Sequence, residues 1–99
     1  MLHIVNKSPT ERQALESCLA HALPGHAVLL IEDAVYAATR GSPGARRLEA
    51  LAKGIEVYVL TPDVQARAMG KSLVAGVVPV DYQGFVDLVA RHPRVQSWL

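Results

Sequence analysis

Cys18 is the one cysteine of this 99-residue sequence, and its thiol offers the most varied chemistry of any side chain present. Apolar neighbours share its face of a helix, at about 100° per residue: Ala14, Leu15, Leu19 and Ala22. Reactive thiolates favour helix N-termini or cationic neighbours, and Cys18 lies about three turns from the expected start of its helix. We therefore favour a buried, structural cysteine over a reactive thiol.

Four histidines are the other candidates for proton transfer or metal binding: His3, His21, His26 and His92. Only His21 and His26 are close in sequence, and their spacing across a Pro-Gly turn matches no zinc pattern. We expect surface or strand-end histidines and no bound metal ion. A Ser–His–Asp set is left open by the sequence, although no nucleophile elbow is present.

Polar residues follow the expected strands, where ligands of open α/β sheets usually bind. These segments are residues 6–8, 32–33, 61–63 and 81–82. Asp33, Thr61 and Asp81 also stand where a helix needs a capping side chain, which explains both their type and their position. We favour capping over catalysis for all three. The sequence contains no G-x-G-x-x-G or Walker motif, so no phosphate-bearing cofactor is predicted.

Short apolar segments alternate with helical segments along the chain. The expected strands are 2–5, 27–31, 55–60, 77–80 and 94–99, and the expected helices are 9–22, 34–39, 45–53, 62–68 and 82–91. Residues 8–11 form a capping box, 40–44 a flexible loop, and Gly54 a helix stop. This alternation predicts a single α/β domain over residues 1–99, with a mostly parallel sheet of about five strands between two helical layers.

Composition limits the functional classes further. Ten basic and nine acidic residues give almost no net charge, which argues against direct nucleic-acid binding. The longest apolar run, residues 27–31, is far shorter than the roughly 20 residues that span a bilayer. The first residues do not read as a secretory signal. With one cysteine and no internal disulfide, we expect a cytoplasmic protein without a membrane partner.

Six segments together resemble the TusB/DsrH family of the DsrE/DsrF-like superfamily, over essentially the whole chain. They are LHIVNKSP at 2–9, LLIEDAVYAA at 29–38, VYVL at 57–60, DVQAR at 63–67, VDYQGFVDL at 80–88 and VQSWL at 95–99. The resemblance implies a DsrEFH-like fold of flavodoxin-like topology. It also implies a subunit of a sulfur-relay heterohexamer with two copies of each chain. The expected partners are DsrE/TusD-like and DsrF/TusC-like subunits, together with a downstream sulfur-acceptor protein.

Two functional branches follow from this resemblance. The segment SPTERQALESCL at 8–19 looks like the DsrH version, which can carry a cysteine in the first helix. We therefore lean to a DsrH-type subunit acting in cytoplasmic sulfur oxidation. The alternative is a TusB-type subunit of the complex that supplies sulfur for 2-thiouridine at the wobble position of tRNA.

The resemblance also bears on catalysis, because in both branches it places the principal persulfide-carrying cysteine on the DsrE/TusD-like partner. We expect a non-catalytic or accessory subunit of a sulfurtransferase complex, without a cofactor. Cys18 as a persulfide carrier is the second hypothesis, since persulfide transfer needs an accessible thiolate. A ligand-binding module of flavodoxin-like shape is the third, because a fold does not fix a function.

Overall fold

The computed structural model of the protein describes residues 1–7, 14–51 and 54–98. In chain order the elements are β1 (Leu2–Val5), α1 (Ala14–His21), β2 (Ala27–Leu30), the 3₁₀ helix η1 (Glu32–Ala38), α2 (Pro43–Glu49), β3 (Glu56–Leu60), α3 (Thr61–Ala66), β4 (Val77–Val80), α4 (Tyr82–Arg91) and β5 (Val95–Trp98). The predicted alternation of strands and helices is confirmed, and β4 and α4 have the predicted bounds.

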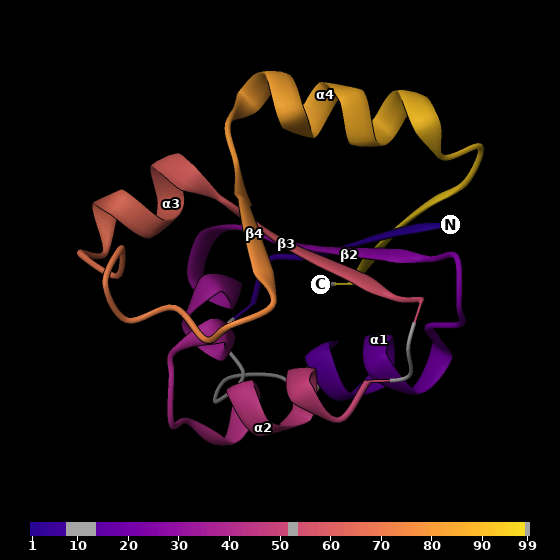
Figure 1. Ribbon diagram of the computed structural model, residues 1–99. Helices are drawn as coiled ribbons and strands as arrows, with labels where there is room; N and C mark the ends of the chain where they lie inside the picture. Colours follow the sequence, from indigo (N-terminus) through magenta and orange to yellow (C-terminus); the bar gives the residue numbers. More distant parts are fainter. Residues whose placement is uncertain (8–13, 52–53, 99) are drawn as a thin grey trace.

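The five strands form one parallel sheet in the order β4-β3-β2-β1-β5. Helices α1 and α2 lie on one face of the sheet and α4 lies on the other (Figure 1). This confirms the three-layer α/β class. The strand order differs from the flavodoxin order 2-1-3-4-5. Here β2, β3 and β4 follow one another on one side of β1, and β5 lies on the other side. The connection from β4 to β5 therefore runs back across the sheet, and it is right-handed only if α4 lies on the face opposite α1 and α2.

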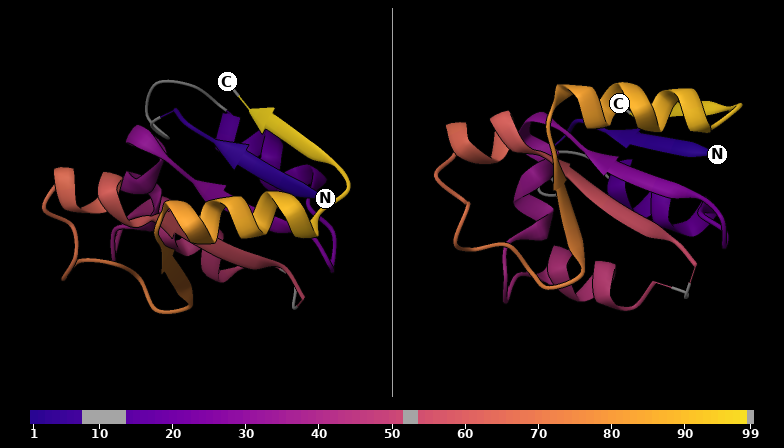
Figure 2. Two further views of the ribbon diagram at one scale, coloured as in Figure 1. Left: turned by 90° about the horizontal axis from the view of Figure 1, so that it is seen from above. Right: turned by 45° about the horizontal axis from the view of Figure 1, so that its top comes forward.

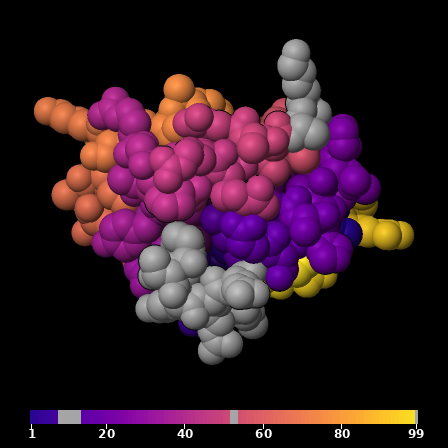
Figure 3. Space-filling view, turned by 90° about the horizontal axis from the view of Figure 1, so that it is seen from below, coloured from indigo at the N-terminus to yellow at the C-terminus, as the bar shows by residue number. Residues whose placement is uncertain are grey.

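The larger part of the core lies between the sheet and the helices α1, η1 and α2. Side chains of β2 and β3, such as Val28 and Val59, pack there against Leu15 of α1 and Leu48 of α2. Figure 3 shows α1 and α2 side by side on this face. All four side chains of β2 are buried, as expected for a strand that is covered on both faces.

The smaller part of the core lies under α4. Leu88 of α4 is buried against Leu2 and Leu29, with Phe85 partly buried beside it. Figure 2 looks down on α4, and β1 and β5 are visible beside it. Among the described residues, α4 is the helix that covers this face of the sheet. No helix of the described residues is long and apolar enough to cross a membrane.

The segment at 40–44 is not the flexible loop that its composition predicts. Ser42 is the N-cap of α2 and its hydroxyl accepts a hydrogen bond from the backbone N–H of Ala45 at 3.1 Å. Pro43 and Gly44 form the first turn of the helix, where proline needs no backbone N–H. Gly44 is buried, and a Cβ atom there would lie 2.6 Å from the carbonyl oxygen of Ala37. This glycine therefore permits close packing of η1 and α2.

Other element boundaries differ by a few residues. Helix α2 ends at Glu49, four residues before the predicted end, which lies outside the described residues together with the capping box at 8–11. The predicted end of α1 near His21 is confirmed. Gly54 does not stop a helix; it has a φ of +92° in the turn that leads into β3.

Candidate functional site

The carboxyl edge of the sheet brings together Asp33, Asp63 and Arg67. Strands β2 and β3 are parallel neighbours, so the segments that follow them leave the sheet at the same edge. Asp33 lies in the first turn of η1, Asp63 in the first turn of α3, and Arg67 is the C-cap of α3. We call these three residues the strand-end cluster.

Arg67 is the centre of the strand-end cluster. Its Nε and Nη2 atoms donate to Oδ1 of Asp33 at 3.0 and 2.8 Å, and its Nη1 donates to the backbone carbonyl of Asp63 at 3.1 Å. The hydrogen bond to Asp33 raises the pKa of Arg67, while burial acts in the opposite direction. The guanidinium carbon also lies 5.9 Å from the centroid of the Tyr36 ring, a cation–π distance.

Asp63 stabilises an unusual backbone conformation at the end of β2. Its Oδ2 atom accepts a hydrogen bond from the backbone N–H of Glu32 at 2.7 Å. Glu32 has a φ of +50°, in the left-handed region that residues other than glycine rarely adopt. Both aspartates thus have partners, and the cluster has no nucleophile. Its arrangement suits recognition and positioning better than acid–base catalysis.

The capping predictions had mixed outcomes. Asp81 caps α4 as predicted, because its Oδ1 accepts from the backbone N–H of Gly84 at 2.8 Å. The predictions for Asp33 and Thr61 were wrong. The N-caps there are Ile31 and Leu60, and neither makes a side-chain capping bond. Both helices start earlier than predicted, so Thr61 is itself helical and Asp33 binds Arg67 instead.

Arg67 was not among the site residues predicted from the sequence. Asp63 and Arg67 are four residues apart, a spacing that places opposite charges side by side on a helix, and this was the available signal. The pairing of Arg67 with Asp33, 34 residues away, carried no such local signal. It depends on the neighbouring positions of β2 and β3 in the sheet.

Cys18 lies in the core and is fully buried, which confirms the expected burial. Burial raises the pKa of its thiol from 9.0 to about 12, and burial is the one cause of this shift. At neutral pH the thiolate is then roughly one part in 10⁵ of the population. The structure therefore holds Cys18 as a neutral thiol among apolar side chains.

The prediction of surface or strand-end histidines was wrong for His3. His3 is buried within β1, where its Nε2 lies 3.0 Å from Nδ1 of His26 and its Nδ1 lies 3.0 Å from Nε1 of Trp98. The ring centroids of His21 and Trp98 lie 5.4 Å apart, with the two planes tilted by 38°. Among the described residues there is no group of three or more His, Cys, Asp or Glu side chains that could hold a metal ion.

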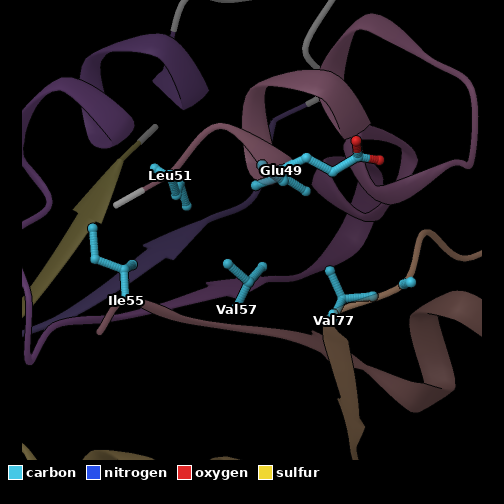
Figure 4. Close-up of a pocket in the computed structure, with 8 residues that line it drawn as sticks. Glu49, Leu51, Ile55, Val57 and Val77 are labelled. Carbon is cyan, nitrogen blue, oxygen red and sulfur yellow. The ribbon is translucent and has the colours of Figure 1, made fainter. Parts of the chain in front are cut away.

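Two recesses open on the surface away from the strand-end cluster. The first measures about 330 Å³ and lies between α2 and the β3–β4 edge (Figure 4). Leu51, Ile55, Val57 and Val77 give it apolar walls, and Glu49 contributes a charged side chain. Ligand sites usually combine an apolar wall with several convergent polar groups, and this recess has no such set.

The second recess measures about 560 Å³ and lies between α4 and strands β3 and β4. Tyr58 and Arg91 are its polar lining residues together with Asp87. The Tyr58 hydroxyl donates a hydrogen bond to the carboxylate of Glu56, and burial followed by this bond raises the pKa of Tyr58. The carboxylate of Asp87 accepts a hydrogen bond from Nε2 of Gln83 at 3.0 Å, so Tyr58 and Asp87 both have partners within the chain.

The same fold occurs in solved structures of small α/β proteins. The ychN protein from Escherichia coli superposes with a TM-score of 0.81 at 20% identity, covering 97% of each chain. A protein from Methanobacterium thermoautotrophicum gives a TM-score of 0.74 at 17% identity, covering 97% of this chain and 95% of that one. At these identities the similarity establishes the fold alone.

Sequence comparisons identify the family. A family model described as DsrH like protein matches residues 7–95. The chain is 37% identical to Protein TusB of Pectobacterium parmentieri over 98 residues, and 36% identical to Protein TusB of Shigella flexneri over 101 residues. Each alignment covers 99% of this chain and 100% of the relative. The chain belongs to the TusB/DsrH family.

Proposed function

We propose that this protein is a TusB-type, accessory subunit of a sulfur-relay complex that supplies sulfur for 2-thiouridine at the tRNA wobble position. The observation that carries the proposal is the full-length similarity to proteins named TusB, at 36% and 37% identity. That similarity favours the tRNA branch over the sulfur-oxidation branch, which the cysteine in the first helix had suggested. The match to the DsrH-like family model supports a relay subunit in either branch.

The environment of Cys18 supports an accessory role for this chain. In persulfide transfer a thiolate attacks the outer sulfur of a donor persulfide, and the donor cysteine leaves as a thiolate. Cys18 is fully buried and its pKa is about 12, so it is neither accessible nor ionised. Sulfur then travels on a cysteine of the TusD-like partner, and Cys18 fills space in the core.

An apolar stripe on α4 supports assembly with other chains. Tyr82, Val86 and Val89 recur at i, i+4 and i+7 and are 63%, 59% and 39% exposed. Exposed apolar patches of this kind mark protein interaction surfaces, because leaving them in water forgoes the free energy of burial. In our proposal the partners are TusC-like and TusD-like subunits in a cytoplasmic heterohexamer, with two copies of each chain.

Co-expression with TusC-like and TusD-like chains tests assembly. We expect the three chains to co-purify, with a native mass that corresponds to two copies of each. Val86→Glu should weaken the complex, whereas Gln83→Glu adds the same charge at another exposed position of α4 and should leave it intact. A chain that stays alone beside both partners would contradict the proposal.

Loading the purified complex with a persulfide donor tests where the sulfur travels. Intact-mass measurement should find one added sulfur atom on the TusD-like chain and none on Cys18. A Cys18→Ala complex should transfer sulfur at the wild-type rate. Added sulfur on Cys18, or loss of transfer in a folded Cys18→Ala complex, would favour the carrier hypothesis instead.

Genetic complementation tests the branch. In a bacterium that lacks its own TusB, this chain should restore 2-thiouridine in tRNA digests, together with TusC-like and TusD-like chains from the same source. Supplying all three chains removes incompatibility between subunits as a cause of failure. Absence of 2-thiouridine from cells that contain the assembled complex would reject the tRNA branch while leaving the assembly proposal intact.

A further inference from the structure

The last strand, β5, is held on the sheet by its backbone pairing with β1 and by the packing of one side chain, Trp98. Three of its four residues are exposed, and Trp98 is the one that packs against the core. The strand pairs with β1 along one edge, and β5 is the terminal strand of the sheet order. Elements with few buried contacts open at a lower cost than the rest of a domain. Beyond the backbone pairing, the contacts of Trp98 are therefore the side-chain contribution that holds β5.

Trp98 begins a chain of hydrogen bonds that runs through two imidazoles. The indole Nε1–H can only donate, so Nδ1 of His3, at 3.0 Å, must accept and carries no proton. In a neutral imidazole the proton is then on Nε2 of His3, which donates to Nδ1 of His26 at 3.0 Å. That Nδ1 also accepts the backbone N–H of Leu23 at 3.2 Å. Both imidazoles must therefore be neutral, each with its proton on Nε2.

An additional proton on either imidazole would break this chain of hydrogen bonds. Protonation of His3 at Nδ1 would set an N–H against the indole N–H of Trp98. Protonation of His26 at Nδ1 would set an N–H against two donors at once. We propose that Trp98, His3 and His26 form a proton-operated latch that holds β5 on β1 and releases it when either imidazole is protonated.

Burial and the charges around the latch also lower the pKa values of the two imidazoles. Burial lowers the pKa of His3, and His26, the N-terminal amine of Met1 and His21 of α1 lower it further. Burial, followed by the same amine, lowers the pKa of His26. Neither set of groups includes a carboxylate, so within the described residues nothing acidic favours the imidazolium form.

The sign of the pH dependence follows from these shifts. The ordinary pKa of both groups is 6.5, and the folded latch holds both below it. Below pH 6.5 the imidazoles of His3 and His26 bind protons in the released state that they do not bind in the closed latch. Acid therefore favours release. Above that pH both imidazoles are neutral in either state and the latch contributes its full stability. The apparent midpoint of release therefore lies below 6.5.

Trp98 is the only tryptophan in the sequence, so its fluorescence reports on the latch directly. On titration of the full chain from about pH 8 to about pH 5, we expect its emission to shift to longer wavelength as the indole enters water. His26→Asn keeps an acceptor oxygen near the position of Nδ1 but cannot be protonated. Release of β5 in this variant should be coupled to the uptake of one proton instead of two. The emission should therefore change less steeply with pH.

Two other histidines provide controls. The ring of His21 contacts Trp98 but takes no part in the hydrogen-bond chain, so the emission shift must persist in His21→Asn. The shift must also persist in His92→Asn, because His92 lies outside the hydrogen-bond chain. A wild-type emission that does not change with pH would overturn the latch. So would a shift that disappears in either control, or an unchanged slope in His26→Asn.

A measurement on the wild-type chain covers the case in which a variant fails to fold. Nitrogen-15 chemical shifts of the imidazoles at about pH 8 distinguish the two neutral tautomers. We expect His3 to carry its proton on Nε2, and the indole N–H signal of Trp98 to exchange slowly with water. A proton on Nδ1 of His3 would be incompatible with the proposed chain.

Discussion

The guanidinium of Arg67 directs two hydrogen bonds to a single oxygen of Asp33, Oδ1, at 3.0 and 2.8 Å. This pair joins the segments that follow two neighbouring strands. The same arginine also bonds the backbone carbonyl of Asp63. One side chain thus connects η1 to α3 and fixes the relative positions of the turns at the carboxyl edge.

We expect Arg67→Gln to lower the free energy of unfolding by about 1 kcal/mol or less, because Asp33 is half exposed and water weakens the pair. Urea unfolding at low and high salt measures this loss, which should shrink as salt screens the charges. Arg47→Gln breaks the more exposed pair with Glu16 and should have a smaller effect. Equal losses in both variants would argue against a structural role for the strand-end cluster.

Replacement of Cys18 distinguishes a packing role from a chemical one. Cys18→Ala should lower the free energy of unfolding by about 1 kcal/mol through lost packing. Cys18→Ser should lower it further, because it buries a hydroxyl among apolar side chains. The raised pKa of the thiol adds a pH signature. Stability should fall as pH rises above 9.0, where the unfolded chain ionises and the folded one does not. Cys18→Ala should remove that slope, and its persistence in the variant would assign it to other groups.

Gly44 tests the contact between η1 and α2. An alanine Cβ there would lie 2.7 Å from the Cα of Ala37, so backbone must move, and we expect a loss of about 1–3 kcal/mol. Gly70→Ala is the matched control, because nothing lies within 4 Å of its added Cβ. Thermal unfolding of the two variants should differ clearly. Similar midpoints would mean that η1 and α2 separate at little cost.

The N-terminus of α4 tests the confirmed cap. Asp81→Ala should cost about 1 kcal/mol, since the N–H of Gly84 loses its acceptor. Thr61→Ala should change stability by less than about 0.5 kcal/mol, because Thr61 makes no capping bond at the start of α3. Denaturant unfolding followed by circular dichroism measures both. A larger loss in Thr61→Ala than in Asp81→Ala would contradict these assignments.

Features with a local cause were predictable from the sequence. The bounds of β4 and α4 follow from a short apolar run, a capping aspartate and the His92-Pro93 stop. The burial of Cys18 follows from helical spacing alone. The alternation of apolar and helical segments predicted the three-layer fold, and the family resemblance implied the same class.

Features with a distant cause were not predictable from local patterns. Asp33 looked like a cap because its partner Arg67 lies 34 residues further along the chain. Gly44 looked like part of a loop because its need for a small side chain comes from Ala37 of another helix. His3 and Trp98 are 95 residues apart, and only the pairing of β1 with β5 brings them together. Strand order sets the Asp33–Arg67 and His3–Trp98 contacts, whereas the contact of Gly44 depends on how η1 packs against α2.

The position of β1 between β2 and β5 also has a consequence for folding. One neighbour of β1 follows it after a single helix, whereas the other is the last strand of the sheet to be synthesised. Until β5 emerges, β1 has an unpaired edge, and such edges promote association between incomplete chains. Closing the β1–β5 pair requires a loop that spans nearly the whole chain, which slows folding. Nascent chains therefore pass through a stage in which β1 is available to a strand other than its own.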